Sequence, residues 1–185
     1  MVTALQRSLL LAALPFLALG SRFQRRADPS TFQLYAYGEG FGGLSVFYAD
    51  GYAYLGDPNL SNSTDAATVT FTATSTNEWL GSPNTTSVTN STHSPTWSNV
   101  TLFIPETGAS DTRVGFLDSN STTTDVLTSA FRFYGQTAMF FGDSGTFETL
   151  WTSLQLENGI RALYWNDTSS GQTPLTLRSI APSAP

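Results

Sequence analysis

Apolar and polar residues alternate at a period of two through most of the chain after residue 26. This alternation is typical of half-buried β-strands, and the residues that dominate the runs (Thr, Val, Tyr and Phe) favour sheets. The runs recur between turn residues, which predicts a single all-β domain: a β-sandwich or barrel of about a dozen short antiparallel strands. The expected strands cover residues 31–37, 44–49, 52–55, 68–73, 99–104, 113–117, 130–134, 137–141, 146–150, 154–156, 160–165 and 174–180.

Two dipeptides between apolar runs are strong hairpin signals. Asp50-Gly51 and Asn158-Gly159 suit a two-residue type I′ turn, in which both residues have positive φ. A weaker signal is an internal echo: residues 53–57 and 139–143 each carry an apolar triplet followed by Gly-Asp. A recurring strand-turn unit would suit a β-trefoil, which we keep as the alternative fold although no third copy is found.

The segment 81–97 interrupts the strand rhythm. It consists almost entirely of Ser, Thr, Asn, Pro and Gly, so it has little apolar area to bury and is predicted to be a long exposed loop. It contains His93, the only histidine of the chain. A histidine in such a loop is expected to be solvated, which argues against a Ser-His-Asp hydrolase.

The N-terminal segment has the pattern of a secretory signal. Residues 1–20 combine a basic start, a short apolar stretch and small residues at the end, which predicts a signal peptide. Residues 21–26 end in Arg25-Arg26, which predicts a short pro-segment cut before Ala27. Removal of these 26 of the 185 residues leaves a mature domain of 159 residues, 27–185. We expect it to be secreted, either extracellular or associated with the cell wall, with no membrane attachment after signal cleavage.

Seven Asn-x-Ser/Thr sequons agree with this compartment, since the pattern marks acceptors for N-glycosylation on secreted proteins. Most fall in the predicted loops, where an attached glycan meets no steric conflict. The predicted N-glycosylation sites are Asn59, Asn62, Asn84, Asn90, Asn99, Asn120 and Asn166.

Composition removes several classes of function. The chain has no cysteine, which excludes disulfides, zinc-thiolate sites and thiol catalysis. Its net charge is −6, and the mature domain, with four arginines and all fourteen acidic residues, carries −10. Such a domain repels nucleic acid and anionic lipid, so neither is expected as a partner.

No cofactor, metal ion or catalytic residue is predicted. Acidic loops at 57–65 and 118–125 could offer oxygen ligands to calcium, but neither has EF-hand spacing, and solvated turns explain them better. Glu39, in a glycine-rich segment, is the acidic residue with the least evident structural role. Tyr35 and Tyr37 lie on the strand face opposite Phe32, where they could stack on sugar rings or pack under a second layer. Tyr35, Tyr37 and Glu39 are therefore candidate carbohydrate contacts.

Strand and turn motifs at both ends of the mature domain resemble uncharacterised small secreted proteins of filamentous ascomycete fungi. The similar segments are 32–38, 42–44, 47–51, 163–166 and 174–178. The resemblance implies a fungal extracellular or cell-wall protein and carries no catalytic residue. We therefore expect a secreted, N-glycosylated, non-enzymatic protein whose partners would be cell-wall or host glycans. The alternative is a carbohydrate-binding module or glycoside-active protein.

Overall fold

The computed structural model describes residues 30–87, 93–121 and 123–183, and 49% of these described residues are strand. The predicted signal peptide, the pro-segment, the start at Ala27 and the sequon at Asn90 lie outside these residues. No helix of the described residues is long and apolar enough to cross a membrane. The strands are β1 Thr31–Phe32, β2 Tyr35–Gly38, β3 Phe41–Ala49, β4 Tyr52–Leu55, β5 Ala67–Ala73, β6 Trp79–Asn84, β7 Val100–Pro105, β8 Gly115–Leu117, β9 Val126–Leu127, β10 Phe131–Tyr134, β11 Thr137–Phe141, β12 Phe147–Glu148, β13 Trp151–Gln155, β14 Arg161–Trp165 and β15 Gln172–Arg178. The 3₁₀ turns are η1 Pro58–Leu60, η2 Thr85–Ser87 and η3 Glu157–Gly159.

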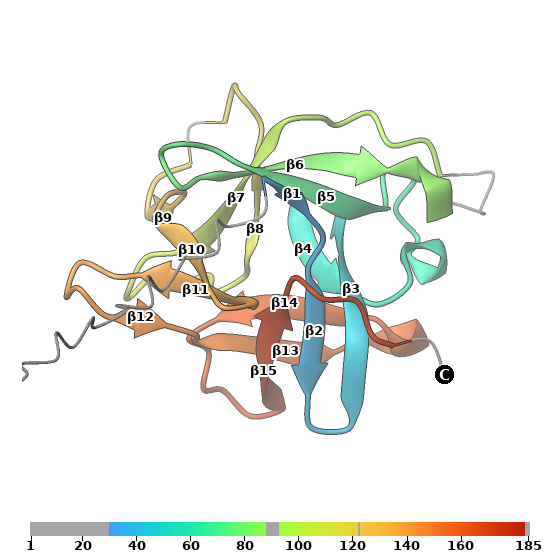
Figure 1. The fold of residues 1–185 in the computed structure, drawn as a ribbon. Helices are drawn as coiled ribbons and strands as arrows, with labels where there is room; N and C mark the ends of the chain where they lie inside the picture. The colour runs from blue at the N-terminus through green and yellow to red at the C-terminus, as the bar shows by residue number, and fades with distance from the viewer. Residues whose placement is uncertain (1–29, 88–92, 122, 184–185) are drawn as a thin grey trace, which may run out of the picture.

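Ten strands form a closed antiparallel barrel (Figure 1). Their order around the ring is β2, β3, β5, β6, β7, β8, β4, β14, β13 and β15, and β15 pairs with β2 to close it. The other five strands add to this ring: β1 pairs with β5, β9 with β7, and the β10–β11–β12 unit joins through β11 and β15. The all-β, single-domain barrel prediction is confirmed. The closed ring of ten strands is not a β-trefoil, so the alternative fold is wrong.

The barrel interior holds one continuous apolar core to which nearly every strand contributes. Strand alternation supplies it: on β4, Ala53 and Leu55 belong to the core, while the intervening Tyr54 stacks against Phe47 on the other face. Trp79 anchors one part of the core, with its ring 5.2 Å from Phe131 and 5.0 Å from that of Phe133, measured between centroids. These contacts fix the β10–β11 hairpin to the barrel, and each such ring pair adds about 0.5–1.5 kcal/mol beyond area burial.

The two predicted hairpins have different outcomes. Asp50 and Gly51 have φ of 50° and 84° between the paired Ala49 and Tyr52, so the two-residue turn with positive φ at both positions is confirmed. Asn158 and Gly159 also have positive φ, but the loop there is longer than predicted. The amide of Leu156 donates to the carbonyl of Ile160 at 2.9 Å, which leaves the three residues of η3 as the loop.

The prediction of an exposed loop over 81–97 is wrong for most of its described part. Residues 79–84 form β6, which pairs with β5 along its whole length. Gly81 is buried there, and the close packing leaves no room for a side chain, since an added Cβ would lie 2.8 Å from Cγ1 of Val69. Pro83 is tolerated because β7 pairs only with Leu80 and Gly81, so β6 has a single neighbour at Pro83. The polar composition of this segment gave no sign of β6, which pairs with β5 on one side and with β7 on the other.

The second half of that segment also packs against the barrel. His93 and Trp97 are each only 8% exposed, so the expectation of a solvated histidine is wrong. His93 Nε2 lies 3.2 Å from the carbonyl oxygen of Ser61, and the amide of Ser94 donates to the carbonyl of Thr64 at 2.8 Å. Residues 93–97 therefore lie over residues 61–65 and are held by main-chain as well as side-chain contacts.

A buried arginine lies at the end of the barrel where β13, β14 and β15 meet. Arg161 is 9% exposed, and burial lowers its pKa. Its Nε donates to Oγ of Ser153 and its Nη2 to Oγ1 of Thr173, both at 2.8 Å, while Nη1 donates to Gln155. The guanidinium carbon lies 4.6 Å from the centroid of the Phe41 ring. The cation is thus held by neutral oxygens and an aromatic face, an arrangement that satisfies its donors within the barrel wall.

Candidate functional site

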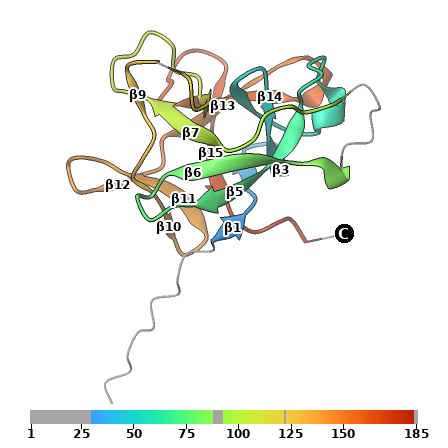
Figure 2. The same cartoon turned by 90° about the horizontal axis from the view of Figure 1, so that it is seen from above.

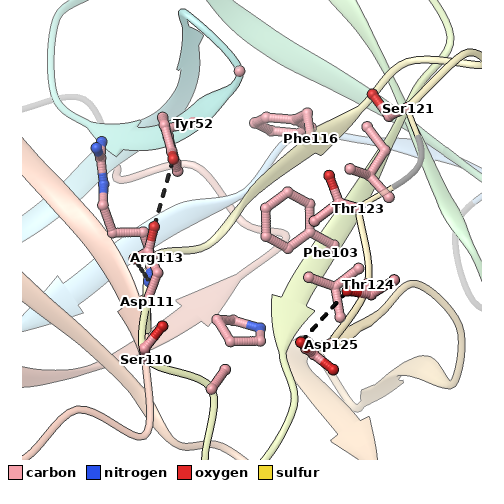
Figure 3. A pocket seen from close by; sticks show the side chains of 15 residues that line it. Tyr52, Phe103, Ser110, Asp111, Arg113, Phe116, Ser121, Thr123, Thr124 and Asp125 are labelled. Atoms are coloured by element: carbon pink, nitrogen blue, oxygen red, sulfur yellow. Dashed lines mark hydrogen bonds between the residues drawn. The ribbon is translucent and has the colours of Figure 1, made fainter.

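Two adjoining hollows lie beside the Asp50-Gly51 turn and share the lining residues Gly51, Phe116 and Ser121. The first hollow has a volume of about 350 Å³ and is lined by β7, β8 and the loops that follow them (Figure 3). The second has a volume of about 510 Å³ and lies between residues 48–51, at the end of β3 and in the turn after it, and residues 96–98. Pockets that hold small ligands fall in the same range of size.

Two aromatic rings form the floor of the first hollow. Phe103 on β7 and Phe116 on β8 are 9% and 6% exposed, and Figure 3 shows them at the centre of the lining. Gly115 makes this arrangement possible, because a Cβ there would lie 2.7 Å from Cζ of Phe103 and 2.6 Å from the carbonyl oxygen of Gly51. The floor is therefore set by close packing of β8 against both neighbours, and it offers apolar surface to a ligand.

One side of the first hollow is an arginine–tyrosine wall. The guanidinium carbon of Arg113 lies 3.7 Å from the centroid of the Tyr52 ring, and its Nη2 donates to the hydroxyl oxygen of Tyr54 at 2.7 Å. The amide of Arg113 donates to Oδ1 of Asp111 at 2.9 Å, and the hydroxyl of Tyr52 donates to Oδ2 of Asp111 at 3.5 Å. The wall is thus a fixed polar surface, in which a cation–π contact holds the tyrosine ring.

The wall is also coupled to a neighbouring tyrosine. Arg113 and Tyr164 form an isolated bridge between the 111–114 segment and β14. Burial raises the pKa of Tyr164, and the nearby Arg113 partly offsets the shift. Nε of Arg113 is buried and has no hydrogen-bond partner, so this N–H of the guanidinium is unused.

The opposite side of the first hollow is rich in hydroxyl groups. Figure 3 shows Thr123, Thr124 and Asp125 across the floor from Tyr52 and Asp111. Asp125 has a φ of 63°, and its carbonyl accepts from the amide of Glu106 at 2.9 Å, which ties this loop to the end of β7. The hollow therefore combines an aromatic floor with hydroxyl and carboxylate groups on its rim, which can hydrogen-bond a polar, uncharged ligand.

The second hollow is acidic. Its lining includes Asp50, Asp65 and Asp118 around Tyr48. Burial raises the pKa of Tyr48, and repulsion from the three carboxylates adds to the shift, while a hydrogen bond involving the backbone of Gly51 opposes it. The described residues contain no group of three or more His, Cys, Asp or Glu side chains arranged to hold a metal ion.

Hydrogen bonds hold the carboxylates of the second hollow in place. Asp118 accepts from the hydroxyl of Ser121 and the amide of Asn120, each at 2.9 Å, and these bonds lower its pKa. Asp65 accepts from the amide and hydroxyl of Thr96, both at 3.3 Å. In the acidic loops that were considered for calcium, these carboxylates accept hydrogen bonds that order the turns.

The sequence-predicted carbohydrate contacts lie away from both hollows. Tyr35 and Tyr37 are half-buried on β2, and Glu39 is exposed at the β2–β3 turn. Tyr35 donates to Oε1 of Gln33 at 2.7 Å, and burial, followed by the neighbouring Tyr37, raises its pKa. Tyr37 donates to the carbonyl of Ile180 at 3.0 Å, so the C-terminal segment lies across this face. The structure brings the two tyrosines together but places neither in the lining of these two hollows, and their sugar-binding role stays a prediction.

Most of the described sequons lie where the sequence placed them. Asn62, Asn120 and Asn166 are exposed in loops, and Asn59 lies in η1. Asn84 corrects the loop assignment, because it is the last residue of β6 and pairs with Thr68. The described sequon residues are Asn59, Asn62, Asn84, Asn99, Asn120 and Asn166.

A separate aromatic cluster lies on the β10–β11–β12 unit, which projects from one side of the barrel (Figure 2). Tyr134 is 71% exposed and Phe147 is 39% exposed, with ring centroids 6.2 Å apart. The ring centroids of Phe141 and Phe147 are 5.1 Å apart. The guanidinium carbon of Arg132 lies 5.3 Å from the centroid of the Phe141 ring. This exposed face is the main competitor to the first hollow as a place for a ligand to stack.

Sequence reasoning missed the first hollow. Its lining comes from five separate stretches of chain, and no local motif joins them. The one signal available was Gly115 in the middle of an apolar run, since glycine inside a strand often marks a close approach.

No protein-family model, curated protein or solved structure matches the chain. The fold and the first hollow define its class: an antiparallel β-barrel with a ligand-sized, aromatic-floored hollow at its surface. The resemblance to secreted fungal proteins stays a prediction.

Proposed function

We propose that the protein is a secreted, N-glycosylated, non-enzymatic extracellular or cell-wall protein that binds carbohydrate in the first hollow. The ligands would be glycans of a cell wall or of a host. The signal-like N-terminus and the seven sequons support the compartment. The acidic net charge of −6 makes nucleic acid and anionic membrane unfavourable partners.

The observation that carries the proposal is the composition of the first hollow. Phe103 and Phe116 offer the apolar floor that the C–H faces of a sugar ring require, and Asp111 and Asp125 supply acceptors on opposite sides. Thr123, together with the other hydroxyl residues of the rim, can exchange hydrogen bonds with sugar hydroxyls. A neutral polyhydroxylated ligand matches this mixture better than an ion or a purely apolar molecule does.

Binding is favoured over catalysis by the state of the candidate catalytic groups. His93 is buried against the carbonyl of Ser61 and is not among the residues that line the first hollow. Glu39 lies at the exposed β2–β3 turn. Asp111, the lining acid on the arginine–tyrosine wall, accepts hydrogen bonds from Tyr52 and Arg113 and acts there as a positioning group. A glycoside hydrolase needs one carboxyl that holds a proton near neutral pH, which burial or a like charge usually provides.

A glycan array tests the proposal. Mature protein, secreted from a eukaryotic host and starting at Ala27, is applied to an array of cell-wall and host oligosaccharides. We expect saturable binding to a related set of neutral glycans, with no release of reducing sugar from the same oligosaccharides. Absence of binding across the array would contradict a carbohydrate ligand, and sugar release would contradict a non-enzymatic role.

Secretion is tested separately by N-terminal sequencing of the product. An N-terminus at Ala27 is the expected result. Retention of the full-length chain inside the host cell would contradict the assigned compartment.

A further inference from the structure

Three of the sequons border the second hollow. Asn120 lies between Asp118 and Ser121, and both of these residues line the hollow. Asn99 lies between Ser98 and Val100, which also line it. The third sequon, at Asn62, is linked to the hollow through the next residue. The hydroxyl of Ser63 donates to Oδ1 of Asp50, which lines the hollow, at 2.7 Å. Glycans at these positions would start at the rim of the hollow.

Hydrogen bonds fix the backbone of the acceptor residue Asn120 at this rim. The backbone amide of Asn120 donates to Oδ1 of Asp118 at 2.9 Å, and the same carboxylate oxygen accepts from the hydroxyl of Ser121 at 2.9 Å. Asn120 itself is exposed, so its side chain is open to modification. A sugar attached there would therefore start from an ordered turn beside the hollow.

The chemistry of the second hollow suits a neutral hydrogen-bond donor. Its described lining holds three carboxylates and no basic side chain. Asp50 and Asp65 each accept from protein groups on Oδ1 in the contacts seen, and a carboxylate has about four lone-pair sites in all. Trp97 covers one face of the Tyr48 ring, and the part of the ring that lines the hollow supplies apolar surface together with Val100 and Phe116. An N-acetylglucosamine unit has hydroxyl and amide donors for the carboxylates and an apolar face for the tyrosine.

We propose that the N-glycan on Asn120 folds back into the second hollow. Its asparagine-linked sugar packs against Tyr48 and donates hydrogen bonds to Asp50 and Asp65. The inference rests on the proposed function, because it requires a secreted and glycosylated chain. The second hollow is then filled by the protein's own glycan, and the first hollow remains the one open to external ligands.

Site-resolved deglycosylation of the native protein tests this proposal. A glycosidase that cleaves at the asparagine is applied to folded protein, and the glycan remaining at each sequon is followed by mass spectrometry of peptides. Each rate is divided by the rate at the same site in denatured protein. We expect release at Asn120 to be at least about tenfold slower than at Asn166, because a docked sugar must first leave the hollow, and a tenfold factor corresponds to about 1.4 kcal/mol.

Two variants separate docking from simple crowding. Asp65→Asn keeps an acceptor for Thr96 but weakens the bond to the sugar, so it should accelerate release at Asn120 and leave Asn166 unchanged. Asp143→Asn, in an exposed turn, is the matched control and should change neither rate.

Three results would overturn the proposal: equal normalised rates at Asn120 and Asn166, slow release at Asn120 that Asp65→Asn does not alter, or an unoccupied Asn120 in a protein glycosylated elsewhere. A chain with no occupied sequon at all would overturn the proposed secreted glycoprotein as well. The two failures are therefore distinguishable in one experiment.

Discussion

The indole ring of Trp97 stacks on the phenol ring of Tyr48, with centroids 4.4 Å apart and an angle of 26° between the planes. Nε1 of Trp97 also donates to the carbonyl of Asp65 at 2.8 Å. The pair joins the 93–97 segment to β3, and both residues line the second hollow. A segment that reads as a polar loop is thereby part of the packed structure.

Trp97→Ala should lower the free energy of unfolding by about 3–5 kcal/mol, the usual cost of removing a large buried aromatic ring. The stack with Tyr48 and the bond to Asp65 would be lost together. Chemical denaturation measures the change, and Ser98→Ala, at an exposed neighbouring position, is the control with an expected effect within about 0.5 kcal/mol. Equal stability of the two variants would show that the segment does not pack as described.

His93→Ala should also destabilise the domain, by about 1–2 kcal/mol, because a buried polar side chain and its hydrogen bond are removed. The ring is 8% exposed and contacts the carbonyl of Ser61. Ser94→Ala is the matched control, since the side chain of Ser94 is exposed and its main-chain bond to Thr64 would remain. Thermal and urea unfolding of both variants measure the change. If His93→Ala were as stable as the wild type, the histidine would be solvated, as the sequence predicted.

The sequence was sufficient for the fold class because strand alternation and turn chemistry are local. β4 and β11 were predicted with their observed bounds, and most other strands to within a few residues. β6 was missed because its residues, including Gly81 and Pro83, are poor strand formers, and pairing with β5 determines its conformation. Tertiary pairing of this kind leaves little trace in a polar segment.

The candidate site could not be predicted for a related reason. Phe103 reads as an ordinary strand residue, and only the register that places it opposite Gly115 turns it into the floor of a hollow. Arg113 likewise has no local motif, and its contact with Tyr52 joins residues about sixty positions apart in sequence. By contrast, Tyr35 and Tyr37 were singled out by a pattern that could not show the C-terminal segment crossing their face.

Gly51→Val should destabilise the domain by about 1–3 kcal/mol through backbone strain. Gly51 has a φ of 84° and nothing within 4 Å of an added Cβ, so any cost comes from conformation and not from a clash. Gly159→Val, with a φ of 79° and equally open space, should cost about the same. The control is Gly42→Ala, where φ is not positive and the nearest atom would lie at 3.4 Å. Denaturant midpoints that matched the control would contradict the turn geometry.

The carboxylate of Asp167 should contribute acid-sensitive stability. Hydrogen bonds from Ser169, followed by those from Thr112 and Gln172, lower its pKa below the ordinary value of an aspartate. A lowered pKa in the folded state gives stability that is present above the unfolded pKa and lost as the pH falls through the folded value, so the loss is expected below about pH 4. Thermal midpoints from pH 7 down to pH 2 should fall less in Asp167→Asn than in the wild type. Asp143→Asn controls for the change in charge, and an identical acid slope in Asp167→Asn and the wild type would refute the coupling.

The central claim is that the first hollow binds carbohydrate, and the most direct test is a glycan array probed in parallel with the wild type and matched variants. Thr124→Trp places a large ring at the rim of the hollow, and Thr107→Trp places the same ring at an exposed position outside the lining. Tyr134→Ala removes the most exposed ring of the competing aromatic cluster. We predict that Thr124→Trp loses at least about tenfold in affinity, or about 1.4 kcal/mol, while Thr107→Trp and Tyr134→Ala bind as the wild type does. Undiminished binding by Thr124→Trp, or binding lost only in Tyr134→Ala, would contradict the assignment of the first hollow as the ligand site.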